Sequence, residues 1–155
     1  MRTVHFQNLG TLFDEHGSQL VELEYASAQK ILQVRWFGNI TGREVVYVAQ
    51  EFLKLQKQLH APYLLNDKSH ATGDWVEAMA WLEYEWLPSA IAEGLRAVAY
   101  VFSPDLGNQF ASVEFTERVS QHIPIKLFYD VPAAWQWLRG QARTSRASGL
   151  GMPPQ

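Results

Sequence analysis

The alternation of hydrophobic and polar side chains near the start of the chain predicts a β-hairpin. In residues 20–25, hydrophobic positions alternate imperfectly with glutamates, which suits a strand with one wetter face. Residues 31–37 are rich in β-branched and aromatic side chains and end at Gly38, so they predict the second strand. Residues 3–6 are a weaker candidate for an additional edge strand.

The pattern then changes to the period of a helix. Thr41 and Glu44 have the spacing of a capping box, in which each side chain hydrogen-bonds the backbone of the other residue. Pro62 disfavours helix in the residue before it, so the helix should end near His60. One apolar stripe repeats every three or four residues, as in an amphipathic helix: Val45, Val48, Phe52, Leu55 and Leu59.

A short strand and a tryptophan-rich helix are predicted next. The strand covers residues 63–65 and is followed by a polar stretch, and Asp74 and Glu77 form a second capping-box pattern. Pro88 should interrupt this helix, and a short helical piece should follow and end at Gly94. The buried stripe of the helix is predicted to be Trp75, Met79, Leu82 and Trp86.

The remaining elements continue the alternation of strands and helices. Residues 95–102 are apolar on both faces, which is typical of a central parallel strand. A helix over residues 108–121 and a strand over residues 125–129 follow. Asp130 is placed to cap a last helix that stops at Gly140.

The predicted order of elements is β-β-α-β-α-β-α-β-α. Strands that alternate with helices imply right-handed crossovers and parallel pairing, and the opening hairpin adds an antiparallel pair. We therefore expect an α/β fold in one domain with a mixed, mostly parallel sheet. Residues 1–19 would be an N-terminal extension or edge strand, residues 20–140 the domain, and residues 141–155 a flexible C-terminal tail, because that stretch is small, polar and rich in Gly and Pro.

Composition narrows the class of protein. The chain has 155 residues with 13 Lys and Arg against 16 Asp and Glu, a net charge of −3, so no strong attraction to nucleic acid is expected. The absence of Cys excludes disulfides, thiolate metal sites and a Cys nucleophile, and it fits a cytoplasmic protein. No segment has the length and hydropathy to span a membrane, and the first residues do not resemble a signal peptide.

Several short motifs occur in an order that resembles the STAS domains of anti-sigma-factor antagonists. The closer resemblance is to the SpoIIAA-like (STAS/SEC14-type) proteins of bacteria, over roughly residues 20–139. The resemblance implies the same α/β fold and a regulatory role exerted through contacts with proteins. The motifs that carry it lie at residues 35–38, 64–67, Trp75 with 85–88, 101–104 and 128–130.

The resemblance also implies a phosphorylatable Ser at the start of the helix after the third strand. This chain has Gly73 and Asp74 at that place, so the phosphosite does not carry over. Asp74 could provide a permanent negative charge at the helix N-terminus, or it could simply be an N-cap, which is far commoner. Ser69 stays a candidate for phosphorylation, although a turn Ser needs no such role.

The polar stretch before Asp74 offers one catalytic hypothesis. His70 could act as an acid or base, with Asp67 orienting it and Ser69 as nucleophile. Proximity in sequence does not establish a triad, so a solvated polar loop that ends a strand is favoured, and we expect no catalytic residues.

A metal site is a further hypothesis for the carboxyl ends of the strands, where ligands gather in open α/β sheets. Oxygen ligands there could hold Mg²⁺ if they converge, but no Asp-x-Asp pair or phosphate-binding Gly loop accompanies them. We therefore expect neither metal nor cofactor. The candidate ligands are Asn66, Asp67, Ser69, His70, Ser103, Asp105 and Asp130.

Aromatic side chains give the main functional hypothesis. Trp81 and Tyr84 fall off the predicted buried stripe, and exposed aromatic residues mark a partner surface or a pocket wall. We expect a non-enzymatic protein-interaction module whose contact surface joins residues 67–75, including Trp75, to Trp81 and Tyr84. The partner would be a second copy, as a homodimer, or another protein. The alternative is a carrier of an apolar or lipid-like ligand in a cleft beside the helix from Trp75 to Trp86.

Overall fold

The structure, a computed structural model, describes residues 4–151; for residues 145–151 it describes the backbone alone. The strands are β1 (Gln7–Phe13), β2 (Gln19–Ala26), β3 (Ile31–Asn39), β4 (Tyr63–Thr72), β5 (Ala97–Val101) and β6 (Ile125–Phe128). The longer helices are α1 (Gly42–Leu59), α4 (Leu106–Val119) and α5 (Val131–Gly151). Between β4 and β5 lie a 3₁₀ turn η1 (Val76–Ala78), α2 (Met79–Trp81), a π-helical turn η2 (Leu82–Trp86) and α3 (Leu87–Ala92).

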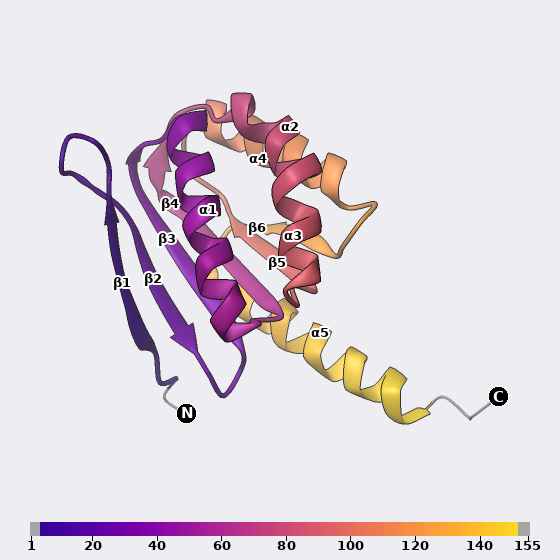
Figure 1. The fold of residues 1–155 in the computed structure, drawn as a ribbon. Helices are drawn as coiled ribbons and strands as arrows, with labels where there is room; N and C mark the ends of the chain where they lie inside the picture. The colour runs from indigo at the N-terminus through magenta and orange to yellow at the C-terminus, as the bar shows by residue number, and fades with distance from the viewer. Residues whose placement is uncertain (1–3, 152–155) are drawn as a thin grey trace.

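Within the described residues the strands form one six-stranded mixed sheet, in the order β1-β2-β3-β4-β5-β6. The first three strands pair antiparallel, and β3 to β6 pair parallel (Figure 1). The predicted single α/β domain with a mixed, mostly parallel sheet is therefore confirmed. The sheet has one strand more than the predicted order, because β1 extends it. This edge strand begins at Gln7 rather than within residues 3–6, and Thr3 lies outside the described residues.

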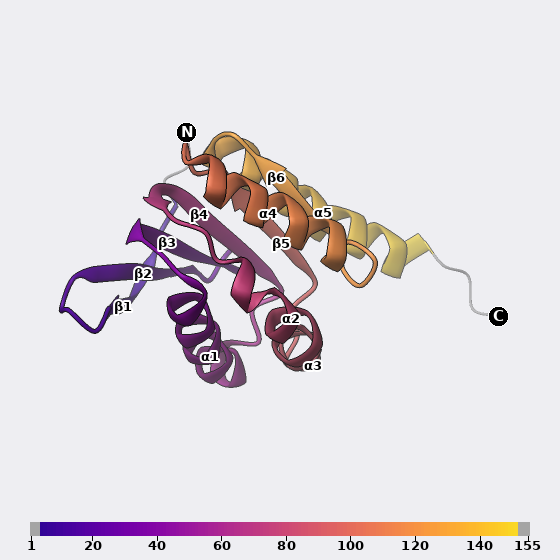
Figure 2. The ribbon, with the colours of Figure 1, turned by 90° about the horizontal axis from the view of Figure 1, so that it is seen from above.

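Helices cover the two faces of the sheet unequally. Each parallel strand lies next to the one before it, so right-handed crossovers place α1, α2 with α3, and α4 on the same face. The opposite face of the parallel strands is covered by α5, which packs on a second cluster that includes Ile31, Leu65 and Ala99. Figure 2 shows α1 and α3 side by side on one side of the strands and α5 on the other.

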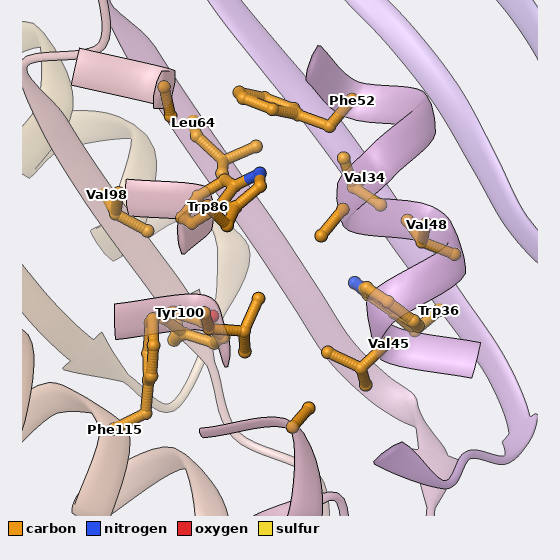
Figure 3. Close-up of a cluster of buried hydrophobic side chains, with 14 of the residues drawn as sticks. Val34, Trp36, Val45, Val48, Phe52, Leu64, Trp86, Val98, Tyr100 and Phe115 are labelled. Atoms are coloured by element: carbon orange, nitrogen blue, oxygen red, sulfur yellow. The ribbon is translucent and has the colours of Figure 1, made fainter. Parts of the chain in front are cut away.

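The larger core lies between the sheet and α1. The predicted stripe is confirmed, because Val45, Val48 and Phe52 are buried, while Leu55 and Leu59 are partly buried against the same cluster. Figure 3 shows the α1 side chains meeting Val34 and Leu64 of the sheet and Trp86 of η2. The Phe52 and Trp86 rings contact each other at 5.4 Å between centroids.

Strand β4 is longer than the sequence predicted. It was expected to stop at Leu65, with a polar loop behind it, but it continues to Thr72. The backbone of this stretch pairs with β3 as far as Asn39 opposite Thr72, and with β5 as far as Val101 opposite Asp67. Both edges of the strand are paired as far as Asp67, and residues 70–72 pair with β3 alone, so polar side chains do not prevent the strand from continuing.

The tryptophan-rich helix is also built differently from the prediction. The segment begins with the turn η1. Pro88 does not end the helix there, because the wider turn η2 precedes the proline and α3 starts with Pro88 in its first turn. The predicted end at Gly94 is confirmed. Gly94 has φ +114° and, with Leu95, donates to Ile91 and Ala90 in a Schellman motif.

The last helix does not stop at Gly140. Helix α5 continues to Gly151, so residues 141–151 of the expected flexible tail are helical. Residues 152–155 lie outside the described part of the chain. Ala142 still packs against the sheet, and Thr144 Oγ1 donates to the Gly140 carbonyl at 2.9 Å. The C-terminal half of α5 projects beyond the sheet (Figures 1 and 2).

Candidate functional site

The loops at the carboxyl ends of the parallel strands are joined by one carboxylate. Asp105 Oδ2 accepts the backbone N–H of Asn108 at 3.1 Å, which caps α4, and also the N–H of Gly73 at 3.1 Å, which fixes the loop after β4. One side chain thus sets the position of α4 relative to the end of β4.

Ser103 strengthens the same junction. Its hydroxyl donates to the carbonyl of Ala71 at 2.5 Å and accepts the N–H of Asp105 at 3.0 Å. The side-chain amide of Gln109, on the first turn of α4, donates to the Ser103 carbonyl at 2.8 Å. These bonds hold the ends of β4 and β5 and the start of α4 together.

Gly73 occupies a position where no other residue fits without a shift. Its φ is +97°, and a Cβ placed on it would lie 2.3 Å from the carbonyl oxygen of Ile40. The loop after β4 therefore passes directly against the loop after β3, and this close approach requires glycine.

Asp74 and Trp75 lie directly before the first turn of the following helical segment. Asp74 Oδ1 accepts the N–H of Val76 at 2.9 Å, so this exposed carboxylate does act as a local cap, although the structure it opens is the turn η1. Trp75 is completely buried, with its ring edge against Phe115 at 5.7 Å between centroids. Trp75 is therefore a core residue and contributes no exposed surface.

The residues of the hypothetical catalytic group do not assemble. Ser69 Oγ donates to Asp67 Oδ1 at 2.6 Å, and Asp67 is buried within β4. His70 is exposed and its ring stacks on Phe37 at 5.7 Å. A bulge in β4 shifts the register between Asp67 and His70, and His70 lies opposite Phe37 of β3. No hydrogen bond among the described residues joins His70 to Ser69 or Asp67, so the three residues do not form the hydrogen-bonded group of the catalytic hypothesis.

A buried lysine that the sequence analysis did not single out lies in the same strand. Lys68 is 1% exposed, and its Nζ lies 3.6 Å from the ring centroid of Trp75, 4.9 Å from that of Trp36 and 5.1 Å from that of Tyr100. No carboxylate within the described residues forms an ion pair with Lys68. Burial therefore lowers the pKa of Lys68 well below its ordinary value.

Three of the side chains beside Lys68 are hydrogen-bonded to one another, whereas the buried indole nitrogen of Trp75 has no hydrogen-bond partner among the described residues. Asn66 Oδ1 accepts the indole N–H of Trp36 at 2.9 Å, and the Asn66 side chain also hydrogen-bonds Tyr100. Burial raises the pKa of Tyr100, and the hydrogen bond with Asn66 opposes that rise. This polar and aromatic group is an internal layer beneath the carboxyl edge of the sheet.

The cavity beside the tryptophan-rich helix is small. It measures about 40 Å³ and is lined by side chains that include Trp36, Lys68 and Trp86. A volume of this size holds one or a few water molecules, whereas ligand pockets measure about 300–1,000 Å³. This cavity is therefore too small for an apolar or lipid-like ligand.

The expected aromatic surface is only partly present. Tyr84 is 68% exposed, but Trp81 is half-buried and packs against the main core. The two residues thus leave a single exposed ring on η2 rather than a patch.

A larger apolar surface lies on the outer face of α4. Leu106 and Phe110 are 67% and 71% exposed, and Val113, one turn further, is 36% exposed. The opposite face of the same helix is packed in the core through Ala111, Phe115 and Val119. We call Leu106, Phe110 and Val113 the α4 stripe.

A shallow hollow adjoins the α4 stripe. It has a volume of about 360 Å³ and is lined by Phe110, Val113, Val76 and three carboxylates, those of Asp74, Glu114 and Glu117. Val76 extends the apolar surface across the turn η1, because it is 44% exposed. Of the predicted surface residues, Asp74 is the one that the structure brings to this apolar surface.

No protein-family model matches this chain, and no curated protein matches it. In the part of the chain that the structure describes, no three His, Asp or Glu side chains are grouped so that they could hold a metal ion. No helix among the described residues is both long and apolar enough to cross a lipid bilayer.

Proposed function

We propose that this protein is a protein-interaction module that pairs with a second copy of itself through the α4 stripe. The observation that carries the proposal is the exposure of Leu106 and Phe110, 67% and 71%, on a helix whose other face is already buried. Exposed apolar side chains at successive turns of one helix form the seam that a partner helix covers.

A two-fold arrangement suits this surface. In an antiparallel pair of α4 helices, Phe110 lies near the axis and faces its own copy, and Leu106 approaches Val113 of the other copy. The hollow beside Phe110, with its apolar wall at Val76, offers space for a side chain of the other copy. The contact therefore uses one surface patch on both copies, as closed dimers do.

A regulatory role of the STAS type is part of the same proposal. It is supported by the mixed sheet, by the helix packed at the carboxyl edge of the parallel strands, and by the exposed carboxylate of Asp74 next to the stripe. In such a role the protein acts by occupying or releasing a partner, not by a chemical reaction.

Sedimentation velocity of the purified protein tests the proposal. The wild-type protein is expected to be a dimer at about 100 µM, with a Kd of about 10 µM. This Kd corresponds to ~7 kcal/mol of binding free energy, so the loss of one central side chain weakens it strongly. The Phe110→Ser variant is therefore expected to be a monomer at the same concentration. Tyr84→Ser is the matched control, because Tyr84 is 68% exposed but lies outside the stripe.

Two results would overturn the proposal. A wild-type protein that remains monomeric at the highest concentration excludes self-association. A dimer that survives Phe110→Ser but is lost in Tyr84→Ser would move the contact to the Trp81 and Tyr84 surface that the sequence predicted.

A further inference from the structure

A second surface lies at the opposite edge of the sheet, where the parallel strands begin. A cleft of about 800 Å³ opens there between the strand starts and α5. Its wall includes the β2–β3 turn, the end of α1, the start of β5 and the middle of α5. The polar side chains that line it are Gln29, Lys30, His60, Arg96, Arg139 and Arg143.

The charge of this cleft has one sign. Four of its lining side chains are Lys or Arg, and no Asp or Glu lines it among the described residues. The chain as a whole carries a net charge of −3, so the cations are concentrated here against the overall balance. A cleft lined by charges of one sign raises the local concentration of ligands of the opposite sign.

Two of the lining residues hold an unusual backbone conformation. Lys30 and His60 have φ of +61° and +48°, and they are the non-glycine residues with positive φ in the part of the chain that the structure describes. A left-handed residue with a side chain costs about 1–2 kcal/mol, and glycine would avoid that cost. Lys30 lies in the β2–β3 turn and His60 is the C-cap of α1, and both residues line the cleft.

The ring of His60 is also fixed at the cleft. Its Nδ1 lies 2.9 Å from the carbonyl oxygen of Glu93, and because a carbonyl only accepts, Nδ1 carries a proton and donates it. The Glu93 carboxylate lies 3.5 Å from the same nitrogen and is outside the cleft wall. The edge of the cleft is thus held between the end of α1 and the end of α3.

Arg139 and Arg143 supply the geometry for recognising an anion. They are one helical turn apart, so both guanidinium groups lie on the same face of α5. Guanidinium groups bind phosphate and carboxylate oxygens through two parallel hydrogen bonds, which adds direction to the attraction. Arg96 makes interactions of its own, so the cations that we assign to the anion are Arg139, Arg143 and Lys30.

We propose that this cleft binds a small polyanion, a molecule that carries two or more phosphate or carboxylate groups. The volume of about 800 Å³ lies within the range of about 300–1,000 Å³ that small-molecule pockets occupy. The site is independent of the α4 stripe, because it lies at the amino edge of the sheet and shares no residue with the stripe.

Isothermal titration calorimetry at low ionic strength tests this site with two probes, inorganic pyrophosphate and citrate. One molecule of probe per chain is expected to bind, and the stronger probe shows whether phosphate or carboxylate groups are preferred. The double variant Arg139→Gln with Arg143→Gln should weaken binding by about a hundredfold. Each lost charged contact costs ~1.4 kcal/mol, which is about tenfold in affinity. Lys30→Asn should weaken it less, and Asn tolerates the left-handed backbone at this position.

The control removes the same number of charges elsewhere. Arg43→Gln with Arg118→Gln changes two arginines that pair with Glu15 and Glu83 and do not line the cleft. This control should bind the preferred probe as the wild type does. If both double variants bound the probe equally weakly, the loss would come from the change in net charge rather than from this cleft, and the proposal would be overturned.

Two other outcomes would also overturn it. One is the absence of heat with both probes. The other is tight binding of a single-stranded oligonucleotide that depends on Arg139 and Arg143 while the small probes fail, since that would make the surface a nucleic-acid site.

Discussion

The Nζ atom of Lys68 lies 3.6 Å from the centroid of the Trp75 ring. Aromatic faces attract an ammonium group by about 2 kcal/mol when water is excluded. An effective desolvation penalty of several kcal/mol opposes this attraction, and within the described residues Lys68 has no carboxylate to offset it. Desolvation therefore dominates, and the amine holds its proton less firmly in the folded protein than in the unfolded chain.

Lys68→Met should make the protein less sensitive to pH. The unfolded amine titrates near pH ~10.4, and the folded amine titrates at a lower pH because its pKa is depressed. Between these values the unfolded state binds more protons, so the free energy of unfolding of the wild type rises with pH, by up to about 1.4 kcal/mol per unit. Methionine has a similar length and no charge, and removes this slope.

Urea unfolding between about pH 7 and pH 9.5 measures that difference. The variant should be more stable than the wild type at the lower end, and the gap should narrow as the pH rises. Tyr100 does not interfere, because burial raises its pKa and it stays protonated in this range. Parallel curves for the two proteins would show that Lys68 does not titrate abnormally.

Gly73→Ala should destabilise the protein by more than ~2 kcal/mol, because it adds a clash to an unfavourable backbone angle. The new Cβ would lie 2.3 Å from the Ile40 carbonyl oxygen. Gly17→Ala is the control, with φ +81° and no atom within 4 Å of the added Cβ, so it isolates the cost of the backbone angle. Similar midpoints in chemical denaturation would contradict the close approach of the two loops.

Truncation of two phenylalanines of α4 should change the free energy of unfolding by very different amounts. Phe115 is 1% exposed, so Phe115→Ala should cost about 3–5 kcal/mol of unfolding free energy. Phe110 is 71% exposed, so Phe110→Ser should change the stability of the monomer by less than ~0.5 kcal/mol. Thermal unfolding at low protein concentration, where a dimer dissociates, separates the two effects. A large loss at Phe110 would mean that this side chain is packed within its own chain.

Asp105→Ala should cost more than an ordinary cap. The Asp105 carboxylate accepts hydrogen bonds from Gly73 and Asn108. Among the described residues, the Asp130 carboxylate accepts one hydrogen bond, from Ala133 at 2.8 Å. We expect about 2 kcal/mol for Asp105→Ala and about 1 kcal/mol for Asp130→Ala. Equal losses in urea unfolding would show that the bond to Gly73 contributes nothing.

The sequence predicted the elements whose patterns are simple. The stripe of α1 and the stripe from Trp75 to Trp86 follow the helical period, and both are buried. The prediction ended β4 too early because Asn66, Asp67 and Lys68 are polar. A pattern of hydrophobic residues does not reveal a buried strand in which Asn66 and Asp67 are hydrogen-bonded inside the protein.

The α4 stripe was missed for a different reason. Leu106, Phe110 and Val113 recur at helical spacing, but so do Ala111, Phe115 and Val119. A helix with two apolar faces does not show from its sequence which face meets the core. Helix α5 was cut short in the prediction because Gly140 is a common helix end, whereas here the chain continues in the same helix.

The sheet order follows the order of the chain, and this has a consequence for synthesis on the ribosome. Each new strand can join the sheet beside the strand made just before it, so no gap has to stay open for a later segment. The face that holds Ile31, Tyr63 and Leu65 is covered only when α5 arrives, and α5 begins at Val131. A nascent chain therefore presents a finished sheet with one bare apolar face, and this face stays exposed to aggregation until α5 has left the exit tunnel.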